Sequence, residues 1–174
     1  MKKRGEVAED LDTKTTTETP LTFPNGIHTA EVEIDPDTGH IVIATYAAVD
    51  DCGNALDPMI VQGQLHGSVA AGLGQVLMEN TIYDKDSGQL VTGSFMDYAM
   101  PRASDMPPLH DAMYNVPATT NPLGAKGVGE AGTTAAISAV MNAVADAIPN
   151  GAGNHLDMPI SAEVLWQACQ RAKI

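Results

Sequence analysis

Glu130 follows a glycine-rich turn, Gly124 to Gly129, and precedes a helical pattern of apolar residues. Glycines let a backbone pass close to a ligand, and a helix N-terminus presents unpaired N–H groups and the positive end of its dipole. A carboxylate at this place acts as a base or ligand contact, or it is an ordinary first-turn glutamate that the dipole favours. The density of glycines before it favours the first alternative.

Two other polar residues lie among glycines. Lys126 lies inside the turn, and it is one of only five Lys or Arg residues after residue 20, which makes its position suggestive. Gln64 lies in the stretch from Gly63 to Gly67, on a predicted helix. It either presents its amide to a ligand or occupies a solvated helix face.

The sequence argues against several other kinds of site. The five histidines show no metal-ligand spacing, so we expect no metal ion held by protein side chains. Cys52 and Cys169 form neither a disulfide framework nor a zinc site, and no Gly-x-Ser-x-Gly nucleophile motif occurs. The pair Asp50-Asp51 precedes a Cys-Gly-Asn stretch, so we interpret it as a turn and not as a catalytic carboxylate pair.

The composition limits the partners and the location of the protein. A net charge of −13 disfavours binding to nucleic acid and to anionic membranes. The chain contains 44% hydrophobic residues but only 4% aromatic ones, which predicts an aliphatic core. It has no secretory signal and no stretch suited to a membrane span, so we expect a soluble, cytoplasmic protein.

Hydrophobic periodicity predicts strands at 28–34 and 40–49, joined as a β-hairpin. A helix begins at Pro58 with Asp57 as its N-cap and runs to about residue 79. It contains four glycines, each costing roughly 1 kcal/mol relative to alanine, so we expect another backbone or a ligand to approach it closely.

The remaining elements complete one domain. A strand or hairpin is predicted at 80–90 with its turn at 84–88, an extended segment at 92–100 and a strand at 110–117, and two helices follow Gly129 and Ser161. This order predicts an α+β fold in which two long helices pack on a mixed β-sheet, with an additional C-terminal helix. We expect residues 1–20 to form a disordered polar tail, because they are charged and lack periodicity.

Several segments, in the same order along the chain, resemble the C-terminal end of the molybdenum-binding large subunit in the xanthine dehydrogenase, aldehyde oxidase and aerobic carbon monoxide dehydrogenase family. The Lys-Gly-Val-Gly-Glu block at 126–130 is the most specific of them. The matching segments are His28–Gly39, Ala48–Gly53, Gly63–Gln75, Gly93–Pro101, Thr120–Glu130, Met141–Ala147 and Asp157–Pro159. The resemblance implies that residues 21–174 are a molybdenum-cofactor-binding domain, as a fragment of a larger family domain.

The resemblance also implies roles for individual residues. The family places a glutamate beside the molybdenum as a general base, and this role falls to Glu130. Gln64 matches a glutamine near the pterin cofactor. The cofactor would be lined through backbone groups and local charge by Lys126, Gly127, Val128 and Gly129. The metal hangs on the pterin dithiolene, so no protein side chain is expected to bind it.

The implied activity is oxidative hydroxylation of an aldehyde, an N-heterocycle or carbon monoxide, with water as the oxygen source. The implied cofactor is molybdenum–molybdopterin in its cytosine dinucleotide form, shared with a partner chain. The implied partners are the remaining molybdenum-binding subunit, an iron–sulfur subunit and an FAD subunit, and a homo-oligomer is compatible with the pattern.

The chain also departs from the family. Large subunits of this family are several times longer and supply further cofactor-binding and substrate-channel segments, and Ala71 stands where relatives often have glutamine. We therefore expect a split subunit or fragment that acts only with a partner chain. The alternative is a non-catalytic remnant or interaction module that keeps the fold and binds no cofactor.

Overall fold

A β-hairpin opens the computed structural model, which describes residues 13–172. Strand β1 (Asn25–Ile34) pairs antiparallel with β2 (Ile41–Asp51), as the alternation predicts. The turn between them uses Gly39 at φ +72°, a backbone region that glycine adopts without strain. Half-buried residues of β1 alternate with exposed ones, so one face of the hairpin carries Ala30, Val32 and Ile34 toward the core.

The third strand makes the sheet mixed. β3 (Leu109–Met113) lies parallel beside β2, which gives the order β1-β2-β3. The predicted strand at 110–117 is confirmed in type but ends earlier, at Met113. Both outer strands of this sheet are edges, and β2 is the central strand.

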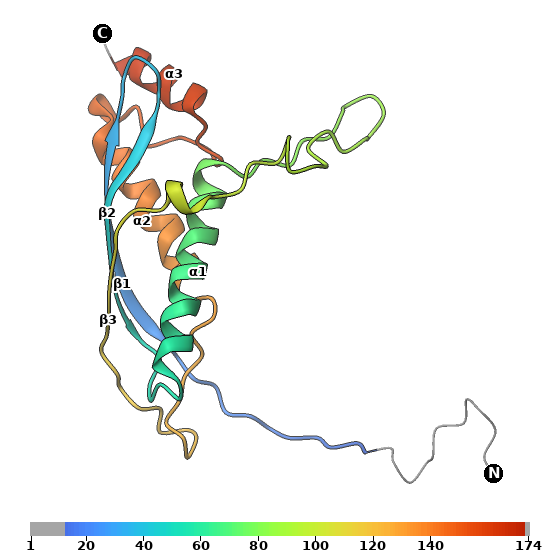
Figure 1. Ribbon diagram of the computed structural model, residues 1–174, viewed down its shortest axis with the longest axis vertical. Helices are drawn as coiled ribbons and strands as arrows, with labels where there is room; N and C mark the ends of the chain where they lie inside the picture. Colours follow the sequence, from blue (N-terminus) through green and yellow to red (C-terminus); the bar gives the residue numbers. More distant parts are fainter. Residues whose placement is uncertain (1–12, 173–174) are drawn as a thin grey trace, which may run out of the picture.

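Two long helices pack beside the sheet, as predicted. α1 (Pro58–Leu77) begins after Asp57, whose carboxylate accepts hydrogen bonds from the N–H groups of Met59 and Ile60. α2 (Ala131–Ala147) lies between α1 and β1 and contacts both (Figure 1). No helix within residues 13–172 is long and apolar enough to cross a membrane.

A shorter helix completes the predicted α+β architecture. α3 (Ala162–Ala172) lies near the tip of the hairpin, where Gly39 approaches the backbone of Ala162. Two short 3-10 helices, η2 (Ala103–Asp105) and η3 (Pro149–Gly151), lie in the connections before β3 and after α2.

The core is aliphatic, as the composition predicts. Tyr46 is the one aromatic side chain among the buried core residues described for this chain. It lies with side chains from the sheet and all three helices, which include Ile43, Leu65, Val69, Val76, Val140, Val144 and Leu165. These residues pack the helices against the hairpin.

Close packing of α1 on α2 depends on small residues. A Cβ atom added to Gly72 would stand 2.7 Å from the Cβ of Ala136, and one added to Gly132 would stand 2.8 Å from the carbonyl oxygen of Leu65. The expected close approach of a backbone is therefore confirmed at Gly72. At Gly63 and Gly67 an added Cβ would meet nothing within 4 Å.

The hairpin predicted at 80–90 is confirmed as a short turn with one antiparallel bridge, and residues 92–100 form no strand. Residues 79–101, which we call the arm, project away from the body (Figure 1) and contain a single bridge, between Tyr83 and Leu90. The apolar residues of the arm find no second sheet or helix to pack on within the described chain, so no extended ladder forms.

The predicted tail falls partly outside the described residues. Residues 13–24 contain no helix or strand and lead away from the body toward the N-terminus (Figure 1). Residues 1–12 lie outside the described part of the chain, so disorder of residues 1–20 stays a prediction.

Candidate functional site

The structure places Glu130 at the mouth of a helix, as the sequence predicts. Glu130 is the N-cap residue of α2, and its carbonyl oxygen accepts the N–H of Thr134 at 3.1 Å. Its side chain makes no capping hydrogen bond and has no ion-pair partner within residues 13–172. The carboxylate is exposed, so it is available to a molecule that binds beside α2.

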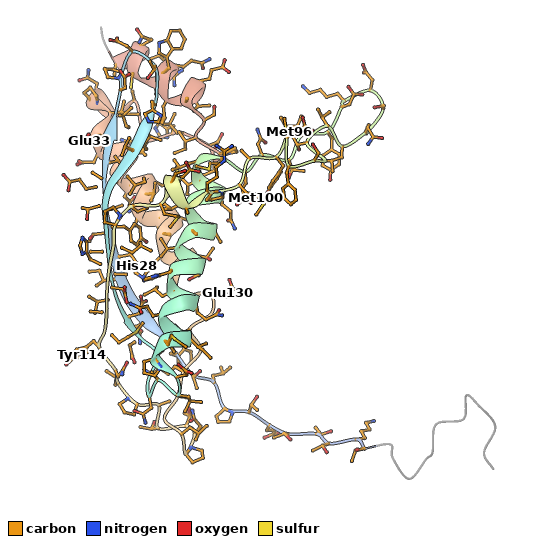
Figure 2. All side chains as sticks on the ribbon, in the orientation of Figure 1. His28, Glu33, Met96, Met100, Tyr114 and Glu130 are labelled. Atoms are coloured by element: carbon orange, nitrogen blue, oxygen red, sulfur yellow. The ribbon has the colours of Figure 1, made fainter. Side chains whose placement is uncertain are left out.

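Glu130 faces a hollow between α1 and the start of α2. This hollow has a volume of about 330 Å³, and its lining includes Gln64, Gly63, Gly67 and Ala71 of α1. The side-chain oxygen of Gln64 lies 3.6 Å from the position that a Cβ on Gly129 would take. The structure thus brings together three of the predicted site residues, Gln64, Gly129 and Glu130, and Figure 2 shows Glu130 beside α1.

The side chain of Lys126 turns away from this hollow. Its ammonium group donates a hydrogen bond to Asp51 at the end of β2, and each side chain is only 10% exposed. The N–H of Lys126 also donates to the carbonyl oxygen of Cys52 at 2.8 Å. Lys126 therefore anchors the glycine-rich turn to the sheet, and its charge is balanced inside the chain.

Asp51 is ionised at this anchor. Burial raises the pKa of its carboxyl group, but the hydrogen bond from Lys126 and those from the N–H groups of Val116 and Gly53 outweigh burial. The net result is a pKa well below the usual range for aspartate.

The neighbouring Asp50 belongs to a second buried group. One ring nitrogen of His28 lies 3.0 Å from Asp50, and the other lies 2.8 Å from the hydroxyl of Tyr46. The His28 side chain is 1% exposed and the Asp50 side chain 3%. Burial, and after it the charge of Asp50, raises the pKa of Tyr46.

These contacts show that our interpretation of Asp50-Asp51 as a turn is wrong. Both residues end strand β2, both are buried, and each pairs with a different base. A signal was available in the sequence, because His28 shares the inner face of β1 with Ala30 and Val32 and needs a polar partner there.

Asp50 and Glu130 also line a second hollow, of about 370 Å³, together with Gly26 of β1 and Ser138 of α2. Glu130 thus lies between two hollows, one beside α1 and one beside β1. A Cβ on Gly26 would stand 2.1 Å from the Asp50 carboxylate, so glycine is required where the strand passes this side chain.

Gly127 and Val128 complete the predicted set. An added Cβ on Gly127 would meet nothing within 4 Å, and Val128 is half-buried, with its carbonyl oxygen accepting the N–H of Ala131 at 3.2 Å. Neither residue lines the hollow beside α1. Residues 13–172 contain no group of three His, Cys, Asp or Glu side chains arranged to hold a metal ion.

Comparison with known proteins gives a consistent result. A family described as the molybdopterin cofactor-binding domain matches residues 1–107. The chain is 37% identical over 153 residues to the 6-hydroxypseudooxynicotine dehydrogenase complex subunit gamma of Paenarthrobacter nicotinovorans, covering 86% of this chain and 19% of that protein. It is 34% identical to the carbon monoxide dehydrogenase large chain of Hydrogenophaga pseudoflava, covering 85% of this chain and 18% of that protein.

Solved structures agree with the sequence comparison. Carbon monoxide dehydrogenase from Oligotropha carboxidovorans superposes with a TM-score of 0.81 at 35% identity, covering 87% of this chain and 19% of that chain. Quinoline 2-oxidoreductase from Pseudomonas putida 86 gives a TM-score of 0.76 at 39% identity, covering 82% and 18% of the two chains.

The chain spans about a fifth of the length of each of these relatives. The match to the family covers more than half of the chain, from residue 1 to residue 107, and it includes α1 and the arm. The chain therefore belongs to the molybdopterin cofactor-binding domain family, and it matches a part of the molybdenum-binding subunits of the xanthine dehydrogenase and carbon monoxide dehydrogenase type.

Proposed function

We propose that this chain forms one wall of a molybdenum–molybdopterin site in a molybdenum hydroxylase, with Glu130 as the general base. One observation carries the proposal: a carboxylate without a partner in the described chain faces the hollow between α2 and the glycine-bearing side of α1. The family supports the cofactor, and the position of Glu130 supports its role.

The residues that line the hollow fit such a cofactor. Gly63 and Gly67 leave free space above α1, so a large planar group can approach the helix backbone. Gln64 offers both a hydrogen-bond donor and an acceptor at the edge of this space. When bound, the cofactor would supply the two-electron redox chemistry, and its pterin would hold the metal without protein ligands.

Glu130 would then move a proton. Its carboxylate accepts a proton from water-derived oxygen during hydroxylation and returns it to solvent afterwards. The second hollow, toward Asp50 and Gly26, gives that carboxylate another open side through which water can reach it. A general base of this kind must lie within hydrogen-bond reach of the proton that it removes, and the place of Glu130 at the edge of the hollow allows this.

Lys126 and Asp51 would act indirectly in this proposal. Their ion pair fixes the glycine-rich turn to the end of β2, so that Gly129 and Glu130 hold their positions opposite Gln64. Gly127 and Val128 would contribute backbone groups to the cofactor once the opposite wall is in place.

The proposal includes the finer assignments that the family suggests. The cofactor would be the cytosine dinucleotide form, and the substrate an aldehyde, an N-heterocycle or carbon monoxide. This chain spans only a fifth of the length of its relatives, so other chains would complete the enzyme. These would be the remaining molybdenum-binding subunit, an iron–sulfur subunit and an FAD subunit, and the assembly would be cytoplasmic.

The test is a comparison of Glu130→Gln with wild type in the assembled complex. We expect an unchanged molybdenum content and a turnover that falls by about 10²–10⁴-fold, the usual contribution of a general base. Glu33→Gln is the control, because Glu33 lies exposed on β1 away from the hollow, and its turnover should stay at the wild-type level. A complex without molybdenum would instead support a non-catalytic module.

A further inference from the structure

The arm, residues 79–101, carries apolar side chains that nothing in the described chain covers. No residue from 80 to 100 is buried. Phe95 is 89% exposed and Met96 93%, and five more large apolar side chains of the arm are exposed, namely Ile82, Tyr83, Leu90, Val91 and Met100. Figure 2 shows Met96 out on the arm, away from the sheet and its helices, and Met100 at the base of the arm near the end of α1.

The arm nevertheless has a defined shape. The N–H of Val91 donates to the carbonyl oxygen of Ile82 at 2.8 Å, and the N–H of Asp84 donates to that of Gln89 at 2.8 Å. The Asp84 carboxylate closes the tip by accepting from Ser87. A hairpin with so few cross-strand contacts is at best marginally stable alone in water, so a further surface is needed to hold it.

The base of the arm is fixed to α1. A Cβ on Gly74 would stand 2.2 Å from the Glu79 carboxylate and 2.8 Å from the ring of Pro101, so both ends of the arm lie against this glycine. The hydroxyl of Tyr98 donates to Glu79 at 2.7 Å and so ties the end of the arm to its beginning. The arm therefore leaves α1 in a set direction.

That direction places the arm on the side of the proposed cofactor site. The hollow that Glu130 faces extends along α1 as far as Gln75, the residue after Gly74. In Figure 1 the arm projects from the end of α1 on the side away from the sheet. A molecule that closes the hollow from outside therefore lies beside the arm.

The composition of the arm is that of an interface core. Phenylalanine, tyrosine and methionine are enriched at the centres of protein interfaces, while the charged residues of an interface lie at its rim. The chain has only two phenylalanines, Phe23 and Phe95, and both are exposed instead of packing in its core. The charged residues Asp84, Lys85 and Asp86 lie at the tip of the arm.

We propose that the arm is a docking element for the rest of the molybdenum-binding subunit, the four-fifths of its relatives' length that this chain does not match. The family match includes the arm, so relatives carry this segment inside a subunit about five times longer than this chain. The inference rests on the proposed function in one respect: the segment that docks on the arm is also the one that closes the hollow.

A second copy of this chain fits the arm less well. A copy would bring the same acidic body, with a net charge of −13, and the same glycine-bearing wall, so the hollow would gain no new kind of contact. The missing part of the subunit differs from this chain in sequence and can supply both apolar pockets for Phe95 and Met96 and the opposite wall.

The experiment places the photo-cross-linker p-benzoylphenylalanine at position 95 of the full chain. The chain is expressed in cells that also make the rest of the molybdenum-binding subunit, either as a separate chain or on the same polypeptide. After irradiation we expect cross-linked peptides from that missing part, identified by mass spectrometry. The same probe at Glu33, on the exposed face of β1, is the control and should give no such peptide.

Two matched double variants measure the contribution of the apolar side chains. Phe95→Ser with Met96→Ser should weaken recovery of the complex at least tenfold, because both side chains lose their pockets. Val42→Thr with Val49→Thr makes two exposed apolar side chains of the sheet polar, and recovery should stay within twofold of wild type.

Several results would overturn the proposal. These are cross-links at position 95 only to a second copy, only to iron–sulfur or FAD subunits, or to no protein, and equal recovery of both double variants. The outcome is separate from that of the proposed function. A cross-linked complex without molybdenum would support docking through the arm and refute the catalytic site. A molybdenum-containing complex without the cross-link would support the catalytic site and refute docking through the arm.

Discussion

Small residues lie on two sides of α1, and they serve a different purpose on each side. Toward α2, Gly72 lies against Ala136, and Ser68 lies where a side chain at Gly132 would stand. Nearer the beginning of α1, Gly63 and Gly67 border the hollow beside Glu130 at the mouth of α2. We call these the closed side and the open side. We group the anchor between Lys126 and Asp51 with the closed side because it is also paired inside the chain, and we group the uncovered arm with the open side.

The difference separates stability from function. On the closed side every glycine has a neighbour inside the chain that explains it. On the open side neither the glycines nor the carboxylate of Glu130 nor Phe95 has such a neighbour among the described residues. Substitutions on the closed side should therefore unfold the chain, and those on the open side should leave it folded and impair assembly or turnover.

The largest loss of stability is expected for Lys126→Met. This change leaves Asp51 ionised in a buried place, and removing one partner of a buried ion pair typically costs about 3–5 kcal/mol. The hydrogen bonds that Asp51 accepts from Gly53 and Val116 remain, so we expect about 3 kcal/mol, measured by urea unfolding.

Lys85→Met is the matched control for that loss. Lys85 lies exposed in the arm, and its replacement should change the free energy of unfolding by less than about 0.5 kcal/mol. In the double variant Asp51→Asn with Lys126→Met, part of the lost stability should return, because no buried charge is left unpaired. An equal loss for Lys126→Met and Lys85→Met would contradict the anchor.

The same anchor gives the chain a pH dependence. The pKa of Asp51 is lower in the folded chain than its unfolded value of about 3.9, so its stabilisation is fully present above that pH. As the pH falls below about 4, the unfolded chain takes up the proton first, and stability is lost. Between pH 6 and pH 2 the free energy of unfolding should fall more steeply for wild type than for Asp51→Asn. Parallel curves would show that the ion pair is not formed in solution.

Gly132→Ala should cause the next largest loss of stability. The added Cβ would stand 2.2 Å from Ser68 and within 2.9 Å of backbone atoms of Leu65 and Val69, which α1 cannot move without repacking. Overpacking of this kind costs about 1–3 kcal/mol, and we expect about 2 kcal/mol by thermal or urea unfolding. A variant as stable as wild type would mean that α1 and α2 lie farther apart than described.

The elements that form the closed side could be predicted because hydrophobic periodicity, turns and helix caps depend on residues that are near each other in the sequence. The hairpin, the Asp57 cap of α1 and the start of α2 follow from residues close to each other in the chain. Glu130 and Gln64 were found from their glycine neighbours, and the structure brings them to the same hollow. Their roles in binding and catalysis stay predictions.

The contacts that sequence analysis missed are long-range. His28 meets Asp50, and Asp51 meets Lys126, 75 residues away, so no local pattern pairs them. The arm was predicted as a strand or hairpin at 80–90 and an extended segment at 92–100. A strand needs a neighbour to pair with, and within the described chain the arm has only itself.

The smallest effect on stability, and the sharpest test of the open side, is expected for Gly67→Ala. In the chain alone, alanine should raise the free energy of unfolding by about 0.5–1 kcal/mol, because an added Cβ meets nothing and alanine favours a helix. In the assembled enzyme the same methyl group projects into the hollow beside Glu130, and we expect a lower molybdenum content or turnover. A gain in stability together with a loss of molybdenum or turnover would show that Gly67 leaves room for a group bound in the hollow. A variant that is more stable and fully loaded with molybdenum would instead show that the open side carries no cofactor.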